Sequence, residues 1–130
     1  MRILLDTNRL TDALRQDESV AAIVEQAEEV WIPFVTLGEI QAGFLGGHPR
    51  RRAHNEALLL RFLRLPAVGV LYPDRETTGV YARLFVQLRH AGTPIPTNDL
   101  WIASLAVQHQ VTVVTHDAHF GKVPQVSLLT

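Results

Sequence analysis

Short apolar runs along this chain alternate with longer segments in which apolar residues recur every three or four positions. The unbroken run that ends at Leu5 predicts a first strand over Arg2–Leu5, buried on both faces. Similar runs predict strands at 30–33, 68–71 and 111–114, and a last strand is expected around Val126. Because strands alternate with helical segments, the pattern predicts an α/β fold with a mainly parallel sheet.

Helical periodicity, capping residues and glycine or proline stops predict six helices between these strands. They are expected from Thr7 or Asn8 to Leu14, from Asp17 to Ala27, from Thr36 to Gly46, from Ala53 to Arg64, from Pro73 to Gly92 and from Asn98 to His109. The segment His48–Arg52 is interpreted as a flexible basic loop. No repeat, low-complexity tract or linker divides the sequence, so residues 1–130 are expected to form one domain.

Composition narrows the function classes. The formal net charge of -1 gives no global positive field for nucleic acid, so a polyanionic partner would be met by a local patch or through metal ions. The absence of cysteine excludes disulfides, thiolate metal sites and a cysteine nucleophile, and it is compatible with a cytoplasmic location. No apolar stretch approaches the roughly 20 residues of a membrane span, and the N-terminal apolar run is too short for a signal peptide.

Four acidic residues, far apart in the sequence, are predicted to meet at one edge of the sheet. Asp6 directly follows the first strand and Asp117 closely follows the fourth. Glu39 and Asp99 fall in the first turns of two predicted helices. In right-handed βαβ units the helices run antiparallel to the strands, so a helix N-terminus lies at the carboxyl edge of the strands. Open α/β folds bind their ligands at this edge.

Each acid also has a local explanation. Asp6 is a suitable N-cap for the first helix, and Thr36 with Glu39 has the spacing of a capping box. Asp99 suits the helix dipole, and Asp117 suits a turn. Their coincidence at one edge favours a shared role, because crowded carboxylates repel one another unless a cation joins them. Mg²⁺ and Mn²⁺ prefer oxygen ligands, and such sites support phosphodiester chemistry.

The sequence resembles the PIN-domain ribonucleases, and among them the VapC-type toxins of toxin–antitoxin pairs. Four segments carry the resemblance, in the order and spacing of that family. They are Asp6-Thr7-Asn8, Glu39, Asn98-Asp99-Leu100-Trp101-Ile102-Ala103 and Thr115-His116-Asp117-Ala118-His119-Phe120. No single segment is specific, but the ordered set covers essentially the whole chain.

This resemblance implies a three-layer α/β/α sandwich with a central, mainly parallel sheet of four to five strands. It implies endonucleolytic cleavage of RNA with Mg²⁺, or Mn²⁺ in its place, held by Asp6, Glu39, Asp99 and Asp117. Asn8 and Thr115 match positions that support these carboxylates or their waters by hydrogen bonding. The implied partners are a second copy of the chain and an antitoxin, a small DNA-binding protein with an inhibitory tail.

Several side chains outside the acidic set have two interpretations. Arg9 stands where the family mostly has an apolar residue; it is interpreted as a solvated helix residue, with an RNA contact as the alternative. The basic stretch with Arg50, Arg51 and Arg52 either binds the RNA backbone or is a solvated face. His116 and His119 flank Asp117 at a spacing typical of metal ligands, but they are interpreted as surface residues.

Apolar residues on the third and fourth helices exceed what two short helices need for packing. Core packing explains most of them, and an antitoxin groove is the functional interpretation. The residues assigned to this groove are Leu37, Ile40, Phe44, Leu58 and Phe62.

Two other function classes fit part of the pattern. A structure-specific DNA nuclease, or another metal-dependent phosphoryl enzyme, would share the acidic edge. A non-catalytic PIN-like module that binds RNA or protein would not require all four acids. Comparing RNA with DNA as the substrate distinguishes a ribonuclease from a DNA nuclease. Metal-dependent cleavage of either substrate distinguishes both nucleases from the non-catalytic module.

Overall fold

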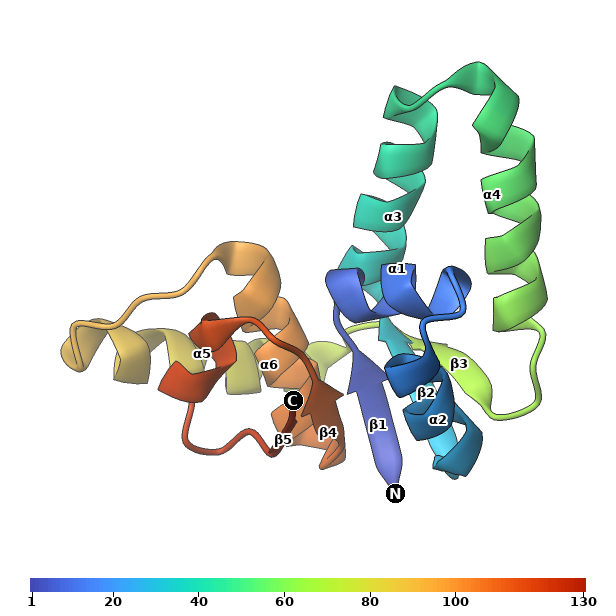
Figure 1. Cartoon of the computed structure of the whole chain (residues 1–130). Helices are drawn as coiled ribbons and strands as arrows, with labels where there is room; N and C mark the ends of the chain where they lie inside the picture. Colours follow the sequence, from blue (N-terminus) through green and yellow to red (C-terminus); the bar gives the residue numbers. More distant parts are fainter.

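Five parallel strands form the central sheet of the protein, in the order β3-β2-β1-β4-β5. The structure is a computed structural model that describes residues 1–130 (Figure 1). The strands are β1 (Arg2–Leu5), β2 (Glu29–Pro33), β3 (Val68–Leu71), β4 (Thr112–Val114) and β5 (Leu128–Leu129). The helices are α1 (Thr7–Leu14), α2 (Glu18–Gln26), α3 (Phe34–Gly46), α4 (Pro49–Leu63), α5 (Arg75–His90), α6 (Thr97–His109) and the 3-10 helix η1 (Ala118–Lys122).

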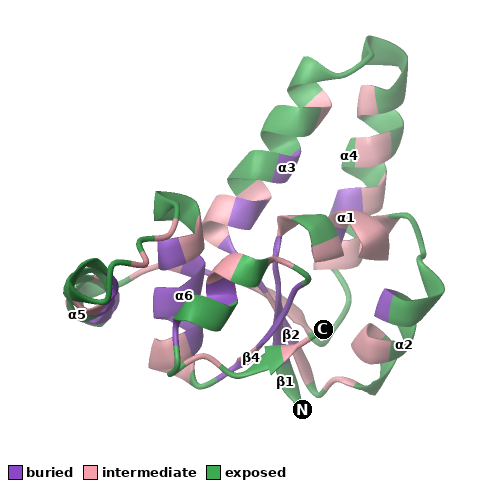
Figure 2. Ribbon diagram, turned by 60° about the vertical axis from the view of Figure 1, so that its left-hand side comes forward, coloured by how far each residue is buried: buried purple, intermediate pink, exposed green.

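Helices cover both faces of this sheet, so the predicted three-layer α/β/α sandwich is confirmed (Figure 1). Alternate residues of β1 enter two separate cores. Leu4 packs with α5, α6 and η1, whereas Ile3 and Leu5 pack with α1, α3 and α4. All three side chains are fully buried, which is what a parallel strand covered on both faces requires (Figure 2).

The centre of the sheet brings the two ends of the chain together. β1 pairs in parallel with β4, and Leu5 lies opposite Val114 in the register. Both strands therefore end at the same level, and the residues that follow them, Asp6 and Thr115, emerge side by side at the carboxyl edge. This pairing joins segments more than a hundred residues apart.

Two helix starts differ from the predictions. The interpretation of His48–Arg52 as a loop was wrong, because α4 begins at Pro49. Proline is suited to the first helical position, and the His48 side chain caps the helix by accepting a hydrogen bond from the Arg50 N–H at 3.1 Å. α3 begins at Phe34 after the cap Pro33, so Thr36 lies inside the helix and forms no capping box with Glu39.

None of the helices is both long and apolar enough to cross a lipid bilayer.

Candidate metal centre

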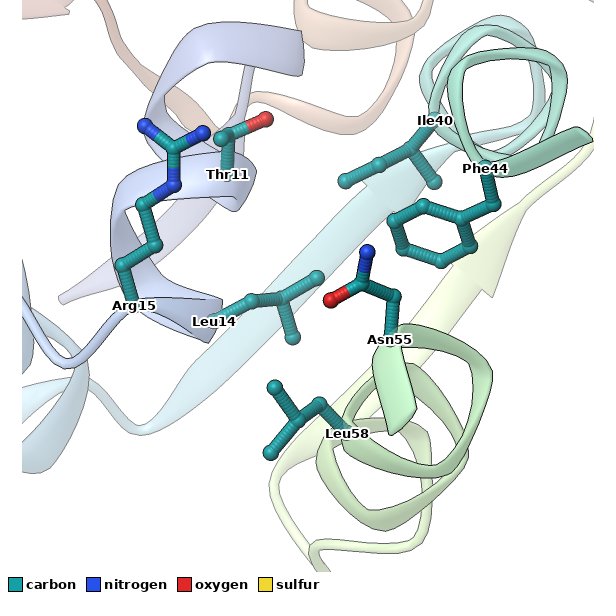
Figure 3. A pocket seen from close by; sticks show the side chains of 7 residues that line it. All are labelled: Thr11, Leu14, Arg15, Ile40, Phe44, Asn55 and Leu58. Atoms are coloured by element: carbon teal, nitrogen blue, oxygen red, sulfur yellow. The ribbon is translucent and has the colours of Figure 1, made fainter. Parts of the chain in front are cut away.

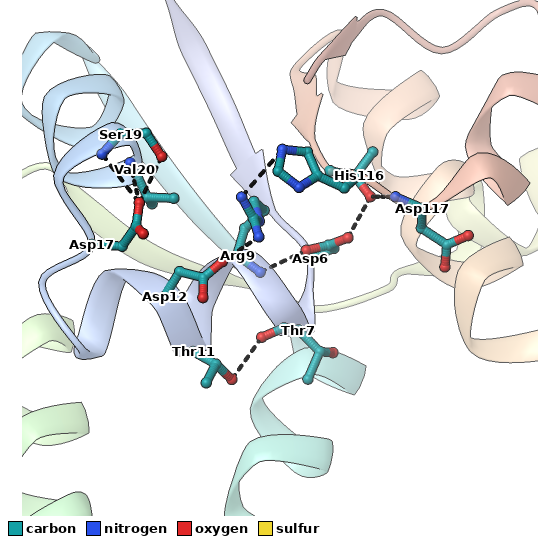
Figure 4. Close-up of polar contacts among 11 residues, drawn as sticks. Asp6, Thr7, Arg9, Thr11, Asp12, Asp17, Ser19, Val20, His116 and Asp117 are labelled. Carbon is teal, nitrogen blue, oxygen red and sulfur yellow. Dashed lines mark hydrogen bonds and ion pairs between the residues drawn. The ribbon is translucent and has the colours of Figure 1, made fainter.

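Asp6 is the most buried of the four predicted acids, with only 6 % of its surface exposed. It is the N-cap of α1, and its Oδ1 accepts a hydrogen bond from the Arg9 N–H at 2.8 Å. Its Oδ2 accepts a second hydrogen bond from the Thr115 hydroxyl. The same hydroxyl oxygen accepts from the Asp117 N–H at 2.9 Å (Figure 4). Thr115 therefore links the end of β1 to the segment after β4.

Asp99 and Asp117 meet through a histidine. Asp99 lies in the first turn of α6, and Asp117 is the N-cap of η1. His119 Nδ1 lies 2.8 Å from Asp99 Oδ2 and 3.0 Å from Asp117 Oδ1. These three residues each offer one ligand atom, and the atoms lie within 4.8 Å of one another. The sequence interpretation of His119 as a surface residue missed this contact.

The electrostatics of the cluster favour a positive partner. Burial raises the pKa of the Asp99 carboxyl, and the charges of Asp117 and Asp6 raise it further, although the hydrogen bond from His119 opposes the shift. An ionised Asp99 is therefore costly in the absence of a cation, which would offset its desolvation and its repulsion by the neighbouring acids.

Glu39 reaches this edge from α3 but lies outside the group of three ligand atoms. Its Oε1 accepts a hydrogen bond from the Thr7 hydroxyl at 3.3 Å, so it sits beside the residue that follows Asp6. The Thr7 hydroxyl also lies 3.4 Å from the Thr36 hydroxyl. Asn8 is exposed and its side chain makes no hydrogen bond in the structure, so its supporting role stays a prediction.

Arg9 is not a solvated helix residue, and that interpretation was wrong. Its side chain is only 15 % exposed, because it forms an ion pair with Asp12 and its Nη1 lies 3.3 Å from His116 Nε2 (Figure 4). The side chain thus connects α1 to the segment between β4 and η1. An RNA contact by Arg9 stays a prediction.

The basic stretch lies at the start of α4, near the tip of the α3–α4 hairpin (Figure 1). Arg50 and Arg51 are exposed. Arg52 is partly buried and donates a hydrogen bond from Nη2 to the Leu45 carbonyl at 2.9 Å, which ties the two helices together. Two of the three arginines are thus free to meet a polyanion.

A shallow groove runs between α1, α3 and α4 (Figure 3). It consists of two adjoining hollows of about 90 and 130 Å³ that share Leu14 and Leu58. Four of the five residues assigned to the groove line it, namely Ile40, Phe44, Leu58 and Phe62. Leu37 instead packs against the core beneath α3. Each hollow is well below the roughly 300–1,000 Å³ of a typical small-molecule pocket, so the groove suits protein side chains better.

A parallel α/β sandwich with carboxylates at the carboxyl edge of its central strands is the architecture of a metal-binding α/β protein of the PIN type. Carboxylate oxygens are ordinary ligands of Mg²⁺ and Mn²⁺, and an imidazole nitrogen is an ordinary ligand of transition metals. The ligand atoms of Asp99, Asp117 and His119 therefore fit a divalent cation.

Comparison with known proteins places the chain within that class. The family model described as the PIN domain matches residues 3–126, and the chain belongs to this family. Toxin FitB of Neisseria gonorrhoeae is 33% identical over 122 residues, covering 88% of this chain and 87% of FitB. Ribonuclease VapC4 of Mycobacterium tuberculosis is 31% identical over 100 residues, covering 76% and 75%. The crystal structure of VapBC2 from Rickettsia felis, bound to a promoter DNA fragment, superposes with a TM-score of 0.87 at 26% identity, covering 99% and 98%.

Proposed function

We propose that this protein is a metal-dependent endoribonuclease and the toxin of a toxin–antitoxin pair. Asp6, Glu39, Asp99 and Asp117 hold Mg²⁺ or Mn²⁺ at the carboxyl edge of the sheet. A bound divalent cation lowers the pKa of a water and stabilises the charge that develops on the phosphodiester oxygens. The membership of the PIN-domain family and the names of the relatives FitB and VapC4 support this proposal.

The chain's own residues give three of the four carboxylates distinct tasks. Asp6 is fixed by two donors, the Thr115 hydroxyl and the Arg9 N–H, so one carboxylate is held rigidly. Asp117 is aligned with it because its own N–H donates to the same hydroxyl. Asp99 contributes a negative charge that is poorly solvated because the side chain is partly buried, and this charge attracts the cation. Such positioning matters because small misplacements of reacting groups are costly in rate.

One observation carries the proposal above the others. The Thr115 hydroxyl donates to the Asp6 carboxylate and accepts from the Asp117 main-chain N–H, and so brings to one edge two acids that are separated by more than a hundred residues. A non-catalytic module has no need for the partly buried Asp99, which Asp117 and Asp6 repel.

The test is cleavage of a mixed RNA pool by the purified protein with Mn²⁺, with Mg²⁺ and with EDTA. We expect fragments with either metal and none in EDTA or with Asp99→Asn. A matched control is Asp12→Asn, since this nearby acid is paired with Arg9 and lies outside the cluster. Cleavage by Asp99→Asn, or equal cleavage in EDTA, would refute the assignment. Cleavage of DNA alone would identify the rival nuclease, and metal binding without any cleavage would favour the non-catalytic module.

The groove between α1, α3 and α4 is the proposed antitoxin site. Its apolar lining and shallow shape suit side chains from a partner segment, and it opens beside Arg15 and Arg61 at its rim. We expect Leu58→Asp to abolish co-purification with the proposed antitoxin when the two proteins are expressed together, while RNA cleavage persists. Glu56→Asp, on the exposed side of α4, serves as the control. Retained binding by Leu58→Asp would place the antitoxin elsewhere.

Two further surfaces are proposed to bind the RNA and a second copy of the chain. The exposed Arg50 and Arg51 are proposed to hold the RNA backbone, and their joint replacement by Gln should raise KM more than it lowers kcat. A homodimer is expected from the family resemblance, and exposed Phe85 and Val86 on α5 offer an apolar surface for it. Sedimentation of the wild type and of Phe85→Glu measures this directly.

A further inference from the structure

His119 stands out among the side chains at the acidic edge because it is a nitrogen donor in a set of carboxylates. η1 begins directly after Asp117, whose Oδ1 accepts a hydrogen bond from the His119 N–H at 2.9 Å. This tight turn folds the ring back toward the acids instead of letting it extend into solvent. The side chain is nevertheless 40 % exposed, so a cation can approach it from solution.

The ring nitrogen of His119 lies as far from its two neighbouring carboxylates as adjacent ligands lie in a metal coordination shell. In an octahedral site with bonds of about 2.1 Å, adjacent ligand atoms lie about 3.0 Å apart. His119 Nδ1 lies 2.8 Å from Asp99 Oδ2 and 3.0 Å from Asp117 Oδ1. The ring nitrogen therefore lies at the distance of a neighbouring ligand from each carboxylate, and the ligand atoms of all three residues lie within 4.8 Å of one another.

We propose that His119 Nδ1 is a ligand of the metal centre and makes this site selective for Mn²⁺ and later transition metals over Mg²⁺. The inference rests on the proposed function, since it concerns the same cation. His119 would bind as the neutral imidazole, with its one ring proton on Nε2 and the lone pair of Nδ1 directed at the cation. Imidazole is a ligand of transition metals, whereas Mg²⁺ is held by oxygen ligands and keeps several waters. An imidazole ligand therefore favours Mn²⁺ and the later transition metals over Mg²⁺.

His116 offers a matched control on the same segment. It lies three residues before His119, but its Nε2 faces Arg9 Nη1 at 3.3 Å and not the carboxylates (Figure 4). A general effect of losing one histidine near Asp117 would appear in both variants. Loss of a metal ligand would appear only in His119→Asn. Asparagine places an amide atom near the position of Nδ1, so the hydrogen bond to Asp99 can persist while the imidazole ligand is removed.

The experiment measures metal binding without reference to cleavage. Titration calorimetry gives the Mn²⁺ and Mg²⁺ affinities of wild type, His116→Asn and His119→Asn. We expect His119→Asn to lose at least about tenfold in Mn²⁺ affinity with a much smaller loss for Mg²⁺, and His116→Asn to match the wild type. Pulsed electron paramagnetic resonance of bound Mn²⁺ should detect imidazole nitrogen coupling in the wild type and in His116→Asn but not in His119→Asn.

The outcomes separate this inference from the proposed function. An unchanged ratio of Mn²⁺ to Mg²⁺ affinity in His119→Asn, or the absence of nitrogen coupling in the wild type, would overturn the role of His119 even if RNA is cleaved. Nitrogen coupling in a protein that cleaves no RNA would support the role of His119 and refute the ribonuclease. A wild type that binds neither metal would overturn both.

Discussion

Thr115→Val tests whether one hydroxyl organises the acidic edge. Thr115 is 1 % exposed, and its hydroxyl donates to the Asp6 carboxylate while accepting from the Asp117 N–H at 2.9 Å. Valine keeps the volume of threonine but removes both hydrogen bonds. A hydrogen bond to a charged group contributes roughly 1.5–3 kcal/mol, and leaving a buried N–H without a partner costs about 1–3 kcal/mol. We expect Thr115→Val to lower the free energy of unfolding by roughly 3 kcal/mol.

Thr115→Ser is the matched control, because it keeps the hydroxyl and removes only a methyl group. Deletion of one buried methyl costs about 0.5–1.5 kcal/mol, so serine should be clearly milder than valine. Urea unfolding at pH 7 with EDTA measures both variants without a contribution from bound metal. Mn²⁺ affinity should also fall in Thr115→Val and stay near the wild-type value in Thr115→Ser. A valine variant as stable as the serine variant would refute the bridging role of the hydroxyl.

Three further perturbations follow from particular contacts. Burial and neighbouring acids raise the folded-state pKa of Asp99, so its ionisation destabilises the fold as pH rises above the ordinary pKa of 3.8. In EDTA at pH 7, Asp99→Asn should therefore unfold at a higher urea concentration than the wild type. This gain in stability should shrink toward pH 4. Gly69 lies opposite Trp31 in the β2–β3 pair, and an added Cβ would come within 2.7 Å of the indole ring, so Gly69→Ala should cost roughly 1–3 kcal/mol in chemical unfolding. Gly43 lies within α3 with open space around an added Cβ, and Gly43→Ala should instead stabilise by about 0.5–1 kcal/mol; a destabilised Gly43→Ala protein would contradict this use of the local geometry.

The fold could be predicted well because its signals are local and repeated. The apolar run of β1 and the run that ends in Val114 identified the two central strands, and alternation with helices predicted the parallel sheet. The strands of a parallel sheet end at one edge, which is how Asp6 and Asp117 could be assigned to the same edge from sequence alone. The last strand lies at Leu128–Leu129, two residues beyond the predicted Val126, because its register is determined by pairing with Val113 and Val114.

The side-chain details of the edge could not be predicted, because they depend on turns and on packing between distant segments. Whether His119 points toward Asp99 or into solvent is decided by the 3-10 turn after Asp117, and a spacing of two residues is compatible with either. The burial of Arg9 requires the segment with His116 to pass over α1, and no local pattern encodes that contact. The start of α4 was missed because the charge of the basic stretch outweighed the helix-start signal of Pro49.

Two carboxylates of this edge have opposite relations to the stability of the fold. Asp6 is deeply buried, yet both of its oxygens accept hydrogen bonds from fixed donors, so its negative charge also holds α1 and the segment after β4 in place. Asp99 is partly buried and is repelled by Asp117 and Asp6, so its charge opposes folding until a positive group arrives. Replacing Asp6 therefore removes a structural acceptor together with a charge, whereas replacing Asp99 removes a charge that the fold holds at a cost and one contact with His119. The need for a cation is accordingly concentrated at Asp99 and its neighbours Asp117 and His119, on the side of the edge where the ring nitrogen lies.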